Sequence, residues 1–287
     1  MLAAAATGIQ VGAAMVATRY VVDQTGPASL ALLRYVIGFC CLLPPALLAS
    51  PRPRFERRDL AAIAALGIGQ FGLLIALLNY GLRFVTSARA ALIFATFPLL
   101  TLIVAVALGR ERLTTAKLAG VLLTVAGVGV AVGEKATGAV TWIGELAVFA
   151  SAFVGAVCSV LYRPYVRKYP TVPVSAFAML ASVAFLAVFA AGEGFFATRP
   201  HFTALGWGAV VFIGGSSGAG YVLWLWALAH ATPTRVTVFL SLSPLTAAVL
   251  GALLLGEPLS SRLGVGVAAV SLGLALAHWR ADELRAP

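Results

Sequence analysis

Charged side chains are scarce in this chain, and their scarcity decides its class. Only 10% of the 287 residues are Asp, Glu, Lys or Arg, whereas 61% are hydrophobic, and the mean hydropathy is +0.99. Soluble domains contain about 25% charged and about 45–50% apolar residues. A soluble globular domain is therefore excluded, and the sequence predicts an integral membrane protein.

Residues that carry metal or covalent chemistry are equally sparse. Cys40, Cys41 and Cys158 lie inside apolar runs, without the spacing of a zinc site or of a disulfide framework. The chain contains no GxSxG, HExxH or Walker A pattern, and its three histidines stand alone near the ends of apolar runs. We therefore expect no catalytic residue, no metal site and no cofactor, and we do not expect an enzyme.

Apolar runs recur along the whole chain, each about as long as a membrane is thick. A spanning helix needs about 20 predominantly apolar residues. The first run has no basic segment before it, so we interpret it as a retained helix and not as a signal peptide. The sequence predicts an all-α membrane protein with ten transmembrane helices, at about 2–22, 28–49, 60–82, 86–108, 115–132, 140–162, 173–191, 204–229, 234–254 and 261–279.

The net charge of +10 comes from basic residues between these runs, where orientation in the membrane explains them better than nucleic-acid binding. If the N-terminus is cytoplasmic, the cytoplasmic side holds thirteen basic residues and the other side six. The thirteen are Arg52, Arg54, Arg57, Arg58, Arg110, Arg112, Lys117, Arg163, Arg167, Lys168, Arg235, Arg280 and Arg285, and the six are Arg19, Arg83, Arg89, Lys135, Arg199 and Arg262. This bias predicts a multi-pass protein with both termini cytoplasmic.

An internal repeat appears when the chain is shifted by 146 residues. Residues 88–121 then lie over 234–267 without gaps, and the scarce residue types match. The matched pairs include Arg89 with Arg235, Pro98 with Pro244, and Glu111 with Glu257. The sequence therefore predicts two five-helix repeats, 1–138 and 139–287. Because five is odd, the second repeat is expected to be inverted in the membrane, as in many secondary transporters.

The same shift matches helix-breaking residues inside the predicted spans. GIGQFG at 67–72 lies over IGGSSG at 213–218, and each half has one proline in mid-span. A mid-span proline frees the carbonyl four residues before it, which is tolerated next to side-chain hydroxyls or a water-filled cavity. We expect breaks or hinges around a central path at Gly69, Gly72, Pro98, Gly215, Gly218 and Pro244.

Three longer motifs resemble a known family. They are ALGRERLTTAKLAGVLLTVAGVGV in the first repeat, LLLGEPLSSRLGVGVAAVSLGLALA in the second, and GELAVFASAFVGAV between them. With the mid-span prolines, they are similar to EamA-type transporters of the drug/metabolite transporter superfamily, and most similar to its bacterial amino-acid exporters. The resemblance implies an inner-membrane carrier whose cavity is formed mainly by helices 1, 3, 4, 6, 8 and 9 in chain order. The additional Arg110 before Glu111 is one departure from the second copy.

Uncharged polar and aromatic residues at mid-span are the candidates for binding a substrate. Hydrogen bonding between helices explains any one of the polar residues equally well, and core packing explains the aromatic ones. As a set that converges from both repeats, they favour a substrate site. They are Gln10, Gln70, Asn79, Tyr80, Thr96, Ser216, Ser217, Tyr221, Trp224, Ser241 and Ser243.

Four charged residues raise the question of ion coupling or substrate charge. Glu111 and Glu257 precede Thr114 and Ser260, so we interpret them as structural residues near helix N-termini. Arg34 lies about two turns into an apolar run, where a charge is costly unless it is paired or reaches the interface. It is a candidate for binding a substrate carboxylate, and Glu145 is its expected ionic partner otherwise.

Together these features predict a secondary transporter that exports small neutral or zwitterionic metabolites by alternating access. Amino acids, including aromatic ones, are the expected substrates, and the lipid bilayer is the expected environment. A broad drug or metabolite exporter is the alternative, and a membrane-embedded enzyme or scaffold is a weaker one. The oligomeric state is open, with a monomer as one option.

Overall fold

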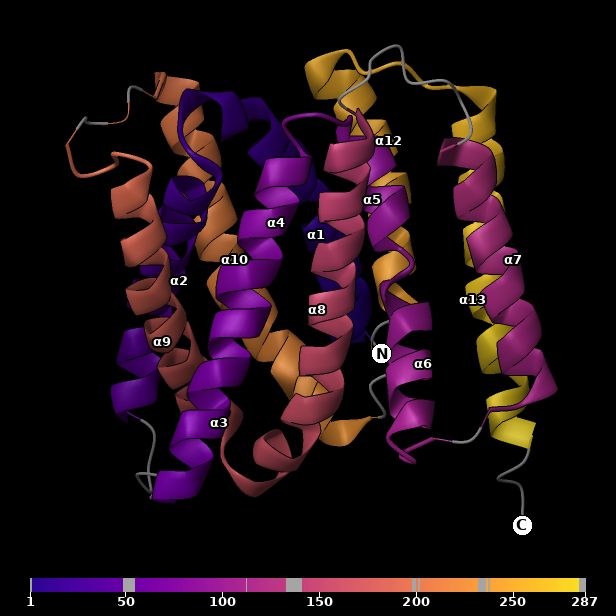
Figure 1. Ribbon diagram of the computed structural model, residues 1–287, viewed down its shortest axis with the longest axis horizontal. Helices are drawn as coiled ribbons and strands as arrows, with labels where there is room; N and C mark the ends of the chain where they lie inside the picture. Colours follow the sequence, from indigo (N-terminus) through magenta and orange to yellow (C-terminus); the bar gives the residue numbers. More distant parts are fainter. Residues whose placement is uncertain are drawn as a thin grey trace.

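The computed structural model (Figure 1) describes residues 2–48, 55–111, 113–132, 141–197, 200, 202–231, 236 and 238–283, and all regular structure in these residues is helical. The elements are α1 (Leu2–Val21), the 3-10 turn η1 (Val22–Gln24), α2 (Pro27–Leu48), α3 (Arg57–Gly67), the π-helical η2 (Ile68–Leu73), α4 (Leu74–Gly81), α5 (Ser87–Phe94), α6 (Phe97–Ala107), α7 (Thr115–Val132), α8 (Thr141–Lys168), α9 (Thr171–Gly192), α10 (Ala204–His230), the 3-10 turn η3 (Val238–Ser241), α12 (Leu242–Leu255) and α13 (Ser261–Glu283).

Six helical stretches in the described residues are long and apolar enough to cross a membrane. They are Pro27–Leu48, Arg57–Gly81, Ser87–Ala107, Trp142–Lys168, Thr171–Gly192 and Ala204–His230. Helices also occupy the other four expected ranges, as α1, α7, α12 and α13. The prediction of an all-helical membrane protein is therefore confirmed.

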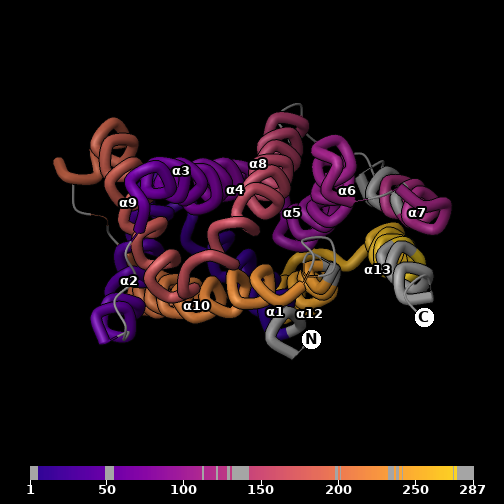
Figure 2. Tube along the Cα trace, turned by 90° about the horizontal axis from the view of Figure 1, so that it is seen from below, coloured from indigo at the N-terminus to yellow at the C-terminus, as the bar shows by residue number. Residues whose placement is uncertain are grey.

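The helices form a bundle in which most of them run side by side (Figure 1). Seen from below, the bundle is elongated, with α7 and α13 together at one edge (Figure 2). These two helices pack mainly against each other and only lightly against α5, whereas α1, α2, α4, α8 and α10 pack closely among themselves. The central helices therefore provide the enclosed interior of the molecule.

The six expected break residues lie at four places in the chain, and helix interruptions are present at three of these places. The helix from α3 to α4 changes to π-helical geometry at η2, which contains Gly69 and Gly72. A turn separates α5 from α6 just before Pro98, and η3 precedes Pro244 in the same way. In contrast, α10 is continuous through IGGSSG.

Close packing explains the glycines of the continuous helix α10. A Cβ placed on Gly218 would lie 2.9 Å from the carbonyl oxygen of Gly38 in α2, and one placed on Gly214 would lie 2.6 Å from Cβ of Ile37. Gly215 faces open space. The small residues of α10 thus let α2 approach closely, as in small-xxx-small contacts between membrane helices, and no break is needed.

Acidic side chains stabilise helix N-termini far away in sequence. Glu193, after α9, accepts hydrogen bonds from the backbone N–H groups of Ala28 (3.0 Å) and Ser29 (2.8 Å) at the start of α2. Glu257 accepts from the N–H group (2.9 Å) and the hydroxyl (2.5 Å) of Ser87 at the start of α5. Carboxylates at these positions satisfy free N–H groups and oppose the positive end of the helix dipole.

The charged segment GRERLT has structural partners as well. Arg110 Nη1 donates to the carbonyl oxygen of Val160 at 2.5 Å. Pro164 lies four residues after Val160 within α8, so this carbonyl lacks its usual helical donor, and the arginine replaces it. Glu111 pairs with Lys117 at 2.9 Å. These contacts agree with the structural interpretation of Glu111 and Glu257.

Candidate functional site

A cavity of about 90 Å³ lies inside the central helices. A single water needs roughly 10–15 Å³, so several waters or a small organic group fit. Its lining residues come from α1, α2, η2, α4, α5, α6, α10 and η3. The lining thus includes α2, which the family resemblance did not imply, and no described residue of α8, which it did. The lining residues are Thr7, Gln10, Val11, Ala14, Met15, Thr18, Arg34, Tyr35, Gln70, Leu74, Ile75, Leu78, Phe94, Phe97, Ser217, Gly220, Tyr221, Trp224 and Leu240.

One face of α1 forms a large part of this wall. Its six lining residues begin at Thr7 and end at Thr18, and they follow each other at steps of three, one, three, one and three. This spacing selects one side of an α-helix. The two threonines were missed by sequence reasoning, although their spacing from Gln10 places them on its face.

The lining respects the 146-residue repeat. Four residues from the first half line the cavity together with the four residues that the shift matches to them in the second half. The pairs are Leu74 with Gly220, Ile75 with Tyr221, Leu78 with Trp224, and Phe94 with Leu240. The two halves therefore meet at this cavity through equivalent positions.

Arg34 provides the charge of the cavity. It is 8% exposed, and its Nε donates to Ser217 Oγ at 2.6 Å, while Ser217 in turn donates to the carbonyl oxygen of Ile213 at 2.5 Å. No carboxylate lines the cavity, and in the described part of the chain Arg34 makes no ion pair. A buried charge without a counter-ion is costly, so the cavity is suited to a bound anion.

The expected pairing of Arg34 with Glu145 is wrong. Glu145, in the first turns of α8, accepts from Arg89 Nε at 2.6 Å and forms an ion pair with the same guanidinium. The reason is that α8 packs against α4 and α5, and Gly144 at its start lies against Gly81 and Phe84. Glu145 therefore does not neutralise Arg34.

Two polar side chains complete the cavity wall with unused hydrogen-bonding atoms. Gln70 lies in the π-helical η2, and its Oε1 is buried without a partner among the described residues. The hydroxyl of Tyr221 is in the same situation. The Phe71 ring lies between those of Tyr35 and Tyr221, with centroid distances of 5.0 and 3.8 Å. Buried polar atoms are nearly always hydrogen-bonded, so these two atoms are available to water or to a ligand.

Gln10 and Ser216 bridge two helices beside the cavity. Gln10 Nε2 donates to Ser216 Oγ at 3.2 Å, and the Gln10 amide lies against Gly220. Gln10 belongs to the cavity lining, whereas Ser216, its hydrogen-bond partner, does not. This contact links α1 to α10, the helices that carry most of the lining.

Among the remaining candidates, Asn79, Tyr80 and Thr96 lie outside the cavity lining. Asn79 donates to the carbonyl oxygen of Pro27 at 3.0 Å, and Tyr80 packs against Phe84. Thr96 donates to the carbonyl oxygen of Ile93 at 2.8 Å. The side chain of Ser241 lies outside the described part of the chain.

Ser243 also lies outside the lining and has a structural partner. Its hydroxyl donates to the carbonyl oxygen of Leu240 at 2.6 Å. This is the carbonyl that Pro244 leaves without a helical donor. Ser243 thus stabilises the interruption between η3 and α12, and Leu240 lines the cavity in its place.

The chain is similar to known transporters along nearly its whole length. Residues 1–133 and 142–279 match the EamA-like transporter family. An uncharacterized transporter of Archaeoglobus fulgidus is 27% identical over 269 residues, which cover 92% of each chain. A probable terminal-alkyne amino-acid exporter of Streptantibioticus cattleyicolor is 31% identical over 269 residues, covering 89% of this chain and 86% of the relative. A crystal structure with 22% identity, covering 99% of this chain and 98% of its own, has a TM-score of 0.73 and shows the same fold.

Proposed function

Because this chain belongs to the EamA-like transporter family, we propose that it exports amino acids or closely related zwitterionic metabolites as a secondary transporter. The observation that carries this proposal is the buried guanidinium of Arg34 in an otherwise uncharged cavity. The name of the Streptantibioticus relative, a probable amino-acid exporter, supports the same substrate class.

The topology belongs to the proposal too. Ten spanning helices in two inverted repeats are supported by helices in all ten expected ranges and by the repeat-matched pairs that line the cavity. The excess of basic residues on one side supports an inner-membrane protein with both termini in the cytoplasm. In this orientation Lys168 lies at the cytoplasmic end of the bundle.

Each part of an amino acid has a complementary part of the cavity. Arg34, held by Ser217, offers hydrogen-bond donors to the carboxylate. The Oε1 atom of Gln70 and the hydroxyl of Tyr221 can accept hydrogen bonds from the ammonium group. Such bonds are stronger than neutral ones because the donor is charged. The rings of Phe94, Phe97 and Trp224 suit apolar or aromatic side chains.

Transport would proceed by alternating access around this cavity. In inverted-repeat carriers the two halves rock about a site near the midplane and expose it to each side in turn. The chain has no ATP-binding motif, so a gradient of substrate or ion supplies the driving force. The protein moves its substrate unchanged, which requires no catalytic residue and no cofactor.

Counterflow in proteoliposomes tests this function. Liposomes loaded with an unlabelled amino acid should take up the same labelled amino acid, and aromatic amino acids should compete. Empty liposomes without the protein give the background. Efflux of cationic drugs without exchange of any amino acid would contradict the proposal and favour the broad drug exporter.

A further inference from the structure

Helices α1 and α8 are equivalent in the two halves, at a register that burial reveals. A shift of 144 residues places Arg19 on Arg163, and every buried position of α1 from Thr7 to Thr18 then falls on a buried position of α8. The exposed Ile9 falls on the exposed Phe153. The two helices therefore present equivalent faces to the interior, although only α1 lines the cavity.

In an inverted repeat, α8 is expected to line the cavity in the opposite-facing state, as α1 does in this one. When the two halves exchange their arrangements, a carrier that is open to one side becomes open to the other. The α8 residues that match the lining of α1 would then line the cavity. Ala14, Met15 and Thr18 of α1 match Cys158, Ser159 and Tyr162 of α8.

Unused polar atoms mark the same region independently. The hydroxyls of Ser159, Tyr162 and Ser182 are buried without a hydrogen-bond partner among the described residues. Ser182, on α9, lies against Gly72 of η2, where an added Cβ would be 3.4 Å from its hydroxyl oxygen. Cys158 of α8 lies against the same element, where a Cβ added to Gly69 would be 2.8 Å from its sulfur. Both α8 and α9 pack against η2, and buried hydroxyls without partners on such helices are expected where water or a ligand reaches in another state.

The contacts at the end of α8 show what holds this region closed. Lys168 Nζ lies 2.6 Å from Glu56 Oε1 and 2.7 Å from Asp59 Oδ2, and the hydroxyl of Tyr169 donates to Asp59 at 2.6 Å. These contacts join α8 to the start of α3, at the lower end in Figure 1. They define the Lys168 end of the bundle.

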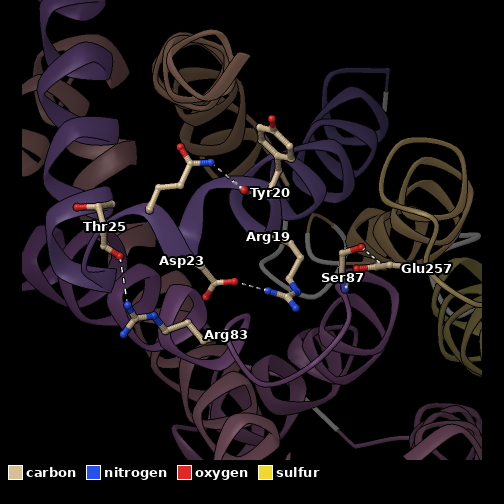
Figure 3. A network of polar contacts seen from close by, with 8 residues as sticks. Arg19, Tyr20, Asp23, Thr25, Arg83, Ser87 and Glu257 are labelled. Carbon is tan, nitrogen blue, oxygen red and sulfur yellow. Dashed lines mark hydrogen bonds and ion pairs between the residues drawn. The ribbon is translucent and has the colours of Figure 1, made fainter. Parts of the chain in front are cut away.

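The matching contact at the opposite end, between α1 and α10, is weaker. Gln24 occupies the position that matches Lys168, and it accepts only the Thr203 N–H group across to the start of α10, at 3.4 Å. Nearby, Arg19 pairs with Asp23 within one helical turn, and Arg83 donates to the carbonyl oxygen of Thr25 at 3.3 Å (Figure 3). This Gln24 end has no ion pair between α1 and α10 among the described residues.

We propose that Cys158, Ser159 and Tyr162 of α8, with Ser182 of α9, line a second half of the transport path that is closed in this structure. This part of the path opens towards the Lys168 end when α8 and α9 move away from α3 and η2. Water and the carboxylate-bearing substrate then enter it. This inference rests on the proposed transport function and assigns the residues of the opposite-facing state.

The native Cys158 reports this opening directly. Cys40→Ser and Cys41→Ser leave it as the single cysteine, because the chain has three. The matched control carries Cys158→Ala as well and Ser175→Cys, at a serine of α9 that is also buried but bonds to the carbonyl oxygen of Thr171. During counterflow, a water-soluble maleimide should modify Cys158 about tenfold faster than the control cysteine, since the minor state becomes well populated.

Modification of Cys158 should also stop transport. If transport proceeds while Cys158 reacts no faster than the control cysteine, the second path half is wrong and the proposed function stands. If no amino acid is exchanged, the proposed function fails.

A second variant tests the closure without any substrate. Lys168→Gln removes both ion pairs at the Lys168 end and should raise the modification rate of Cys158 about two- to fivefold, the effect expected of exposed ion pairs. Arg19→Gln, which removes an ion pair at the Gln24 end, should not raise it. An unchanged rate in Lys168→Gln would overturn the proposed closure even in a preparation that transports nothing.

Discussion

The helix pair α1–α2 and the helix pair α8–α9 place their polar side chains in opposite environments. The first pair turns Thr7, Gln10 and Arg34 towards a cavity, whereas the second buries Ser159 and Ser182 without partners. Because the proposed repeat makes α1 equivalent to α8, we attribute this difference to the state of the molecule as well as to its sequence. Under this proposal, one structure indicates which residues line the path in the opposite-facing state.

The largest expected effect comes from removing the charge that distinguishes the first pair. Arg34→Gln should lower counterflow of amino acids on the order of 100-fold, because truncating one partner of a buried charge pair costs several kcal/mol. Arg34→Lys should retain part of the activity. Labelled amino-acid exchange in proteoliposomes measures both variants, and Arg19→Gln is the exposed arginine control. Full exchange by Arg34→Gln would mean that the substrate carboxylate binds elsewhere.

A smaller effect is expected where α8 differs from α1 by a proline. Arg110→Ala leaves the carbonyl of Val160 without a donor and should lower the free energy of unfolding by about 1–3 kcal/mol. Adding Pro164→Ala should restore most of this loss, because the new backbone N–H can donate to Val160. Thermal unfolding of the detergent-solubilised protein compares the stabilities of the wild type, the two single variants and the double variant. Equal losses in the single and double variants would show that the arginine acts in another way.

The smallest effect is expected at the start of α2, which depends on a residue of the second half. Glu193→Gln keeps an acceptor but removes the charge opposite the helix dipole, and it should cost about 0.3–1 kcal/mol. Glu193→Ala should cost more, since the N–H groups of Ala28 and Ser29 lose their partner. The same unfolding assay ranks the two variants, and a reversed order would contradict the capping role.

Much of the fold followed from the pattern of apolar runs and prolines. Helices occupy all ten expected ranges, and the interruptions before Pro98 and Pro244 follow from the missing N–H group of proline. The continuous α10 did not follow, because glycines that break a helix and glycines that admit a neighbour look alike in one sequence. Gly218 is distinguished only by its contact with Gly38.

The cavity was predictable where polar residues interrupt apolar helices, and less so elsewhere. Gln10, Gln70, Ser217 and Tyr221 were candidates that lie in its wall, whereas Ser243 donates to the carbonyl oxygen of Leu240 in η3. Which carboxylate meets which arginine depends on packing between distant segments. For this reason the pairing of Glu145 with Arg89 required the structure.

Ligand binding with three matched compounds tests the central claim most directly. L-phenylalanine has both charged groups, 3-phenylpropanoate lacks the ammonium, and phenethylamine lacks the carboxylate. Isothermal titration of the solubilised protein should show binding of L-phenylalanine and 3-phenylpropanoate and no binding of phenethylamine. The Arg34→Gln variant should bind neither of the two carboxylate compounds. Binding of phenethylamine as tight as that of L-phenylalanine would contradict the assignment of Arg34 as the carboxylate site.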